Sequence, residues 1–222
     1  LEAYRIPIVE VPGFEADDVI GTLARKASEE GFMAYMMTPD KDFAQLVTGK
    51  VVMYRPGRGG GEAEIWGEKE IMREYGVAPS NITDLLGLMG DSSDNIPGAP
   101  GIGPKTACRL ISEHGDIETL LGKTSELSGR HKDILEQNRE QILLSKRLAT
   151  IEQNVPLEFS HEEFHRSETD LEALRKLYEE LEFRTMASRL PVSEGIAPGK
   201  ARQDVAATEA SASETPDGAL SL

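Results

Sequence analysis

The sequence predicts an α/β fold in which a partial, mostly parallel sheet is followed by a helical region. In residues 1–78, short apolar runs of strand length alternate with amphipathic helical segments, the order typical of α/β cores. Residues 79–190 show helical periodicity with no strand pattern between the helices. Residues 191–222 have few large apolar side chains and many Ala, Ser, Thr, Gly and Pro, as in a disordered linker.

The composition limits the function classes. The chain has 222 residues, 39% of them hydrophobic, so it can form a core, and no apolar run approaches membrane-spanning length. Its one cysteine, Cys108, excludes an internal disulfide and fits a reducing compartment. A net charge of −15 argues against a general nucleic-acid binder, but not against an enzyme whose acidic centre is neutralised by divalent ions.

The first elements alternate between strand and helix. Residues 6–11 are expected to form a short strand that Pro12 and Gly13 end, and residues 14–27 an amphipathic helix. Residues 32–38 are apolar throughout, which predicts a strand buried on both faces.

Later segments complete this predicted core. Strands are expected at residues 51–54 and 64–66, with a flexible glycine turn between them and Trp66 in the core. The remaining segments are expected to be helical: 68–75, from 79 or 80 to 88, 104–114, 116–121, 132–149 and 170–181.

Acidic residues gather at two of the predicted element ends. Glu15, Asp17 and Asp18 lie at the start of the first helix, where carboxylates also complement the helix dipole. Asp40 and Asp42 follow the predicted strand at residues 32–38, and ligands of open α/β sheets gather at the carboxyl ends of strands. Helix capping and a ligand role both remain open for the helix-start group.

The stretch from Gly87 to Thr106 combines two chemistries. Asp91 and Asp94 offer the oxygen ligands that Mg²⁺ or Mn²⁺ prefers, although Asp-Ser-Ser-Asp-Asn is also a plausible helix-ending turn. A Gly- and Pro-rich turn then leads into a helix start that can hold a phosphate, with Lys105 adding positive charge. The sequence argues against a nucleotide-binding P-loop, because Pro104 separates Gly103 from Lys105 and no strand pattern precedes the turn.

Together these groups predict a metal centre. If the carboxylates converge, they repel one another unless divalent cations hold them, and two ions about 4 Å apart would activate water against a phosphodiester. Seven residues form this predicted set: Glu15, Asp17, Asp18, Asp40, Asp42, Asp91 and Asp94.

Three motifs carry a family resemblance. They are Phe14-Glu15-Ala16-Asp17-Asp18, Thr38-Pro39-Asp40-Lys41-Asp42, and the run from Met89 to Gly98 continued by Gly101 to Ala107. They resemble the 5′-nuclease domain of bacterial DNA polymerases I, within the flap-endonuclease-like family and its PIN-like fold. The resemblance covers about residues 6–189.

The resemblance implies a metal-dependent 5′→3′ exonuclease and 5′-flap endonuclease that uses Mg²⁺ or Mn²⁺ at a two-metal site. It makes the seven carboxylates metal-site residues and residues 85–114 a helix–three-turn–helix element that grips duplex DNA, with K⁺ at the turn 98–103. The DNA partner would be a duplex with a 5′ flap or 5′ end, a polymerase portion would be covalently linked, and the location would be the bacterial cytoplasm at the nucleoid. The implied DNA-binding residues are Gly98, Gly101, Ile102, Gly103, Lys105, Thr106 and Arg109.

Two departures from the family pattern lead to further expectations. Pro39 stands where the family has glycine. The family's first strand, a metal-binding aspartate on it and a basic helical arch would precede Leu1, so we interpret the chain as a fragment with little activity alone. A DNA-binding fragment without catalysis and a PIN-type ribonuclease are the alternative functions.

Overall fold

The computed structural model describes residues 1–57 and 61–191, which divide into two compact units, Leu1–Thr169 and the part from Asp170 onward. Residues 192–222 of the tail predicted at residues 191–222, and three residues of the predicted glycine turn, lie outside this description. No helix among the described residues is long and apolar enough to cross a membrane.

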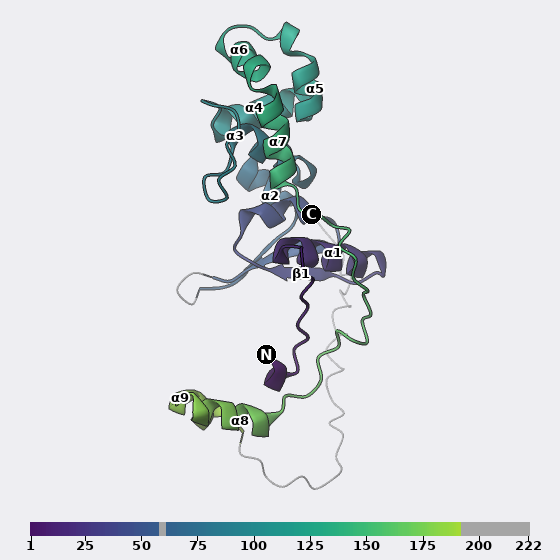
Figure 1. The fold of residues 1–222 in the computed structure, drawn as a ribbon, viewed down its shortest axis with the longest axis vertical. Helices are drawn as coiled ribbons and strands as arrows, with labels where there is room; N and C mark the ends of the chain where they lie inside the picture. Colours follow the sequence, from purple (N-terminus) through teal and green to yellow (C-terminus); the bar gives the residue numbers. More distant parts are fainter. Residues whose placement is uncertain (58–60, 192–222) are drawn as a thin grey trace, which may run out of the picture. The chain divides into compact units, whose positions relative to one another are not determined.

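The first unit contains a three-stranded sheet in the order β1-β2-β3. β1 (Ala34–Met37) is parallel to β2 (Val51–Arg55), as expected, and β3 (Glu64–Trp66) is antiparallel to β2. Helix α1 (Ala16–Glu29) packs against β1 and β2 (Figure 1). The buried indole of Trp66 donates to Glu64 (2.7 Å), so the expected core position of Trp66 is confirmed.

One strand prediction was wrong, and for a second strand the predicted length and burial were wrong. Residues 6–11 form no strand in the described structure, and Ile8 is 61% exposed, because Pro7 lacks a donor and no neighbouring strand pairs with this segment. The second predicted strand is shorter than residues 32–38 and is not buried on both faces. β1 lies at the edge of the described sheet, and only Met36 of its four residues is buried.

The helical region follows the predicted order with one break. It contains 3₁₀ helix η4 (Pro79–Asn81), α3 (Ile82–Met89), α4 (Pro104–His114), α5 (Ile117–Gly122), η5 (Thr124–Glu126), α6 (Arg130–Gln137) and α7 (Arg139–Ala149). Before it lie η1 (Glu2–Tyr4), η2 (Lys41–Leu46) and α2 (Glu68–Tyr75). The single helix predicted at residues 132–149 is therefore two helices. Asn138 separates them, and its side chain donates to the Ile134 carbonyl (2.8 Å), a local bond that competes with helix continuation.

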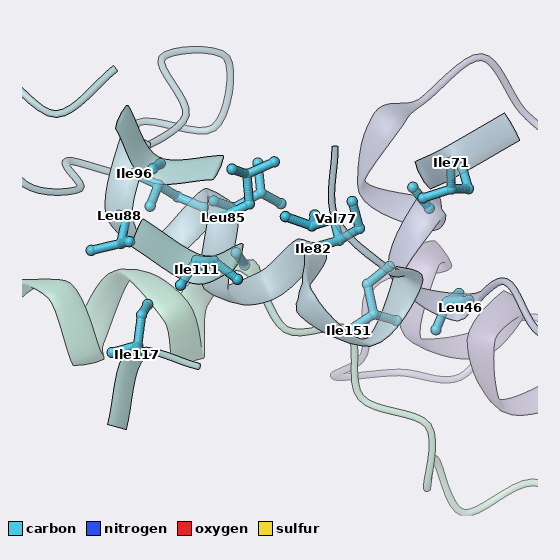
Figure 2. Close-up of a cluster of buried hydrophobic side chains, with 14 of the residues drawn as sticks. Leu46, Ile71, Val77, Ile82, Leu85, Leu88, Ile96, Ile111, Ile117 and Ile151 are labelled. Atoms are coloured by element: carbon cyan, nitrogen blue, oxygen red, sulfur yellow. The ribbon is translucent and has the colours of Figure 1, made fainter. Parts of the chain in front are cut away.

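One continuous apolar core joins the sheet to these helices. Leu46 and Ile151 lie at one end of the cluster in Figure 2, and Leu88 and Ile117 at the other. Gly21 on α1 permits the close approach of Ile151, whose Cγ2 would stand 3.0 Å from an added Cβ. Because the core runs through both regions of this unit, the acidic motifs and the Gly-rich turn are held in one framework.

The second unit contains α8 (Leu171–Glu180) and α9 (Arg184–Arg189). Asp170 caps α8, as expected, by accepting from the Ala173 N–H (3.0 Å). The helix predicted at residues 170–181 is not the last one, since α9 follows it.

Candidate metal centre

Seven carboxylates from three separate segments meet in one place, defined here as the acidic pocket. Six of them line a cavity of ≈ 350 Å³, together with Ile96 and residues 148–151: Glu15, Asp17, Asp18, Asp40, Asp42 and Asp94. The seventh, Asp91, offers an oxygen that lies within 4.8 Å of oxygens of Asp42 and Asp94. The structure therefore brings together every residue of the predicted metal set.

The start of α1 gives its three acids different roles. Glu15 is the N-cap residue, and its N–H donates to Asp18 Oδ2 (3.3 Å). Asp18 Oδ1 accepts from the Glu152 N–H (2.9 Å), so both oxygens of Asp18 have protein partners. Burial and the negative charges of Asp40, Glu15 and other acids raise the pKa of Asp17. Asp18 thus caps α1 and links it to Glu152. Asp17 is instead influenced by the negative charges of the other acids in the pocket.

The segment after β1 forms a short 3₁₀ helix, η2, at whose start Asp40 and Asp42 line the acidic pocket. Asp40 is the N-cap of η2, and its Oδ1 accepts from the Asp42 N–H (3.0 Å). Gln45, one turn later, donates to the Asp42 carbonyl (2.9 Å). These local bonds fix the backbone of Asp42 at the carboxyl end of β1, where α/β folds place their ligands.

A tight loop after α3 presents the last two acids. Asp91 and Ile96 exchange two backbone hydrogen bonds of 2.8 and 2.7 Å, closing the loop. The Ser93 N–H donates to Asp91 Oδ1 (2.9 Å), which directs the buried Asp91 side chain, while Asp94 stays exposed. Asn95 has a φ of 59°, a left-handed conformation that asparagine tolerates better than most residues.

The electrostatics of the acidic pocket favour a bound cation. Burial, opposed by Lys41 and supported by the charges of Asp40, Asp91 and Asp94, raises the pKa of Asp42 to about 6. Burial also acts to raise the pKa of Asp91, but hydrogen bonds from Lys41 and Ser93 hold it below its usual value. Lys41 forms an ion pair with Asp91 and lies 3.8 Å from Asp42 Oδ1, a buried oxygen without a hydrogen-bond partner in the described part of the chain. Clustered oxygen donors, among them this buried oxygen without a hydrogen bond, suit a divalent ion.

The Gly-rich turn at residues 98–103 lies next to this loop. Gly98 has a φ of 60°, and an added Cβ would stand 2.3 Å from the Gly90 nitrogen, so only glycine fits. Ile102 is buried, whereas Lys105 and Arg109 are exposed. Within residues 1–57 and 61–191, four N–H groups of the turn and of α4 have no hydrogen-bond acceptor: Gly101, Gly103, Lys105 and Thr106.

Three residues around these sites were not found from the sequence. Lys41 pairs with the acids as described, and Gln45 joins η2 to the end of α7. The Arg130 guanidinium, on α6, lies 3.2 Å from the position of an added Cβ at Gly101. The Asp-Lys-Asp pattern was a signal for Lys41, but nothing local in the sequence indicates that residue 130 returns to residue 101.

Comparison with known proteins agrees with this architecture. A solved structure of a bacteriophage T5 flap endonuclease, in a pseudo-enzyme-product complex with DNA and metal ions, matches with a TM-score of 0.57 at 21% identity. The match covers 64% of this chain and 52% of that one. The fold is therefore of the flap-endonuclease class.

The chain belongs to the 5′-3′ exonuclease family. Residues 1–76 match the family's N-terminal resolvase-like domain, and residues 77–172 match its C-terminal SAM fold. DNA polymerase I of Bacillus caldotenax is 41% identical over 86% of this chain, which spans 22% of that protein. A 5′-3′ exonuclease of Aquifex aeolicus is 34% identical over 84% of this chain and 62% of its own length.

Proposed function

We propose that this chain is the catalytic region of a divalent-metal-dependent 5′→3′ deoxyribonuclease that cuts DNA at a 5′ end or 5′ flap. The convergence of seven carboxylates around one pocket carries the proposal, because no simple structural role requires so much like charge in one place. Family membership supports the same reaction and does not favour a PIN-type ribonuclease.

The acidic pocket fits a two-metal site for Mg²⁺ or Mn²⁺. Asp42, Asp91 and Asp94 would hold one ion, and Asp17 and Asp40, which line the same cavity, would contribute to the second. Such ions supply an activated water and stabilise the leaving oxygen. The protein's part is to fix the carboxylates by the turns described above, and to balance their charge with Lys41 when no ion is bound.

The turn at residues 98–103 and the start of α4 would bind a phosphate of the duplex. Their free N–H groups, with the ammonium of Lys105 and the nearby guanidinium of Arg130, form a positively charged surface in a chain of net charge −15. The second lone pairs of the turn carbonyls could hold K⁺. Exchanging K⁺ for Na⁺ in a DNA-binding assay tests that point.

The biological setting is part of the proposal. Since the full-length relatives named as DNA polymerase I are far longer than this chain, we propose a covalently linked polymerase portion. The substrate would be the 5′ end or flap met during repair synthesis, which places the protein with the bacterial nucleoid in the cytoplasm.

A flap-cleavage assay with Mg²⁺ tests the function. It uses a labelled duplex with a 5′ flap and follows cleavage of the flap by this chain. Asp91→Asn should reduce cleavage at least 100-fold, as expected for loss of a metal ligand. Asp133→Asn, the same chemical change at an exposed site on α6, should leave the rate unchanged.

Two results would contradict this proposal. Cleavage that survives both EDTA and Asp91→Asn would show that the acidic pocket is not the reaction centre. Duplex binding without cleavage would support the alternative of a DNA-binding fragment.

A further inference from the structure

Helix α7 holds the Gly-rich turn through both backbone polar groups of Gly98, its N–H and its carbonyl. The Gly98 N–H donates to Ser145 Oγ (3.1 Å), and the Gly98 carbonyl accepts from Gln141 Nε2 (2.6 Å). Ser145 is fully buried, so its hydroxyl is shielded from solvent at the contact with Gly98. These two side chains, four residues apart on one helix face, fix Gly98 to α7.

The other end of α7 holds the acidic pocket. Gln45 of η2 donates to the Ala149 carbonyl (2.9 Å) and accepts from the Ile151 N–H (2.9 Å). The next residue, Glu152, donates its N–H to Asp18. Two of the three acidic segments are thus hydrogen-bonded to α7 or to the residues that directly follow it.

The helix between these two attachments is itself fixed. Ile142 and Ala149 are buried in the core, and Lys146 forms ion pairs with Asp84 of α3 (2.6 Å) and Glu118 of α5 (2.7 Å). From Gln141 to Ala149 a helix rises about 12 Å at 1.5 Å per residue. A regular helix changes length very little, so the separation of its two attachments is nearly constant.

We propose that α7 is a strut that sets the distance between the duplex-binding turn and the acidic pocket, and thereby the nucleotide that is cut. Gln141 and Ser145 are then positioning residues that act through Gly98. This inference rests on the proposed function. A purely structural role for the same bonds would affect stability but not the position of the metal centre along bound DNA.

Affinity cleavage can measure that position without enzymatic turnover. Fe²⁺ replaces Mg²⁺ in the acidic pocket and reduces added hydrogen peroxide to hydroxide and a hydroxyl radical, while ascorbate returns the resulting Fe³⁺ to Fe²⁺. The cut sites on an end-labelled flap duplex then report where the pocket lies. The proteins compared are the unmodified chain, Gln141→Ala, Ser145→Ala and the control Leu144→Ala, whose side chain is 42% exposed on the same helix. Asp91→Asn should abolish the localised cuts, which identifies the pocket as the radical source.

The unmodified chain and Leu144→Ala should give the same narrow maximum. Gln141→Ala and Ser145→Ala should shift or widen it by about one nucleotide, because a strand advances 3.4 Å per nucleotide. Their DNA affinity in EDTA should fall less than about tenfold, the equivalent of one hydrogen bond. If Ser145→Ala does not fold, Gln141→Ala, at a half-buried site, provides the same test.

The possible failures are distinguishable. Maxima of unchanged position and width in both variants would overturn the strut and leave the proposed function standing. Absence of localised cuts in the unmodified chain, despite DNA binding, would count against the metal centre and therefore against both proposals.

Discussion

Asp42 shows how the acidic pocket acts on a single residue. Within the part of the chain that the structure describes, its buried Oδ1 has no hydrogen-bond partner. Burial and the neighbouring carboxylates raise the pKa of Asp42 to about 6, and the charge of Lys41 opposes this shift. An ionised carboxylate in this position destabilises the metal-free fold. The same strain favours cation binding, because a divalent ion replaces repulsion by attraction.

Asp42→Asn should therefore stabilise the metal-free protein. In EDTA at pH 7.5 we expect the free energy of unfolding to rise by about 1–2 kcal/mol, less than the full pKa difference implies because solvent screens part of it. A raised pKa means that the folded state binds the proton more tightly. The gain should thus be complete above pH 6 and shrink as pH falls from 6 towards 3.8.

Urea unfolding across this pH range checks the prediction. In excess Mg²⁺ the order should reverse, since the variant lacks a ligand. If the variant is less stable than the unmodified chain in EDTA at pH 7.5, the ionised Asp42 carboxylate does not destabilise the metal-free fold.

Lys105 provides a test of phosphate binding. Lys105→Ala should weaken duplex binding to a similar extent for unrelated sequences and reduce the salt dependence of binding by about one phosphate contact. Lys123→Ala, at an exposed site after α5, is the matched control and should change neither. Fluorescence anisotropy over a salt series measures both quantities, and a loss confined to one DNA sequence would contradict a phosphate contact.

At the scale of elements, one buried carboxylate joins three helices. Asp84 Oδ1 on α3 accepts from the Ile117 N–H at the start of α5 (3.1 Å) and pairs with Lys146 on α7. Gly87, one turn later on α3, leaves room for α7, since an added Cβ would stand 2.9 Å from the Lys146 Cβ. A charge and a glycine therefore determine together how closely α7 approaches α3.

Asp84→Ala should cost about 2–4 kcal/mol of unfolding free energy, because it leaves a buried N–H unpaired and removes a buried partner of Lys146. Glu118→Ala removes the exposed partner of the same lysine and should cost less than about 1 kcal/mol. Denaturant melts of the two variants provide the comparison, and equal losses would show that burial of Asp84 does not decide the strength of this joint.

At the scale of the whole molecule, seven of the 39 acidic side chains gather in one pocket, where a cation can neutralise them. We expect Mg²⁺ to raise the melting temperature at constant ionic strength, with about 2.7 kcal/mol of stabilisation at a hundred times the dissociation constant. Asp91→Asn should remove most of this shift, and Asp133→Asn none of it. A shift that NaCl reproduces at equal ionic strength would indicate general screening instead of a metal site.

Local signals in the sequence predicted most of the elements. Gly103 and Pro104 determine where α4 starts, Gly76 ends α2 in a left-handed conformation, and Asp170 caps α8, so these boundaries follow from the residues themselves. Where the outcome depended on a neighbour, prediction was weaker. Residues 6–11 have the composition of a strand, but a strand forms only if another strand pairs with it.

The sequence by itself determined which acidic side chains are available as metal donors and where helix α4 starts, because carboxylates, glycines and prolines have the same chemistry in any fold. Tertiary structure decided that the acidic segments meet in one pocket, that Asp18 accepts a hydrogen bond from the Glu152 N–H, and that Arg130 lies beside Gly101. It also decided that α7 joins the pocket to the Gly-rich turn. Each of these contacts links residues far apart in the chain, and their pairing depends on how the core packs and not on any local preference.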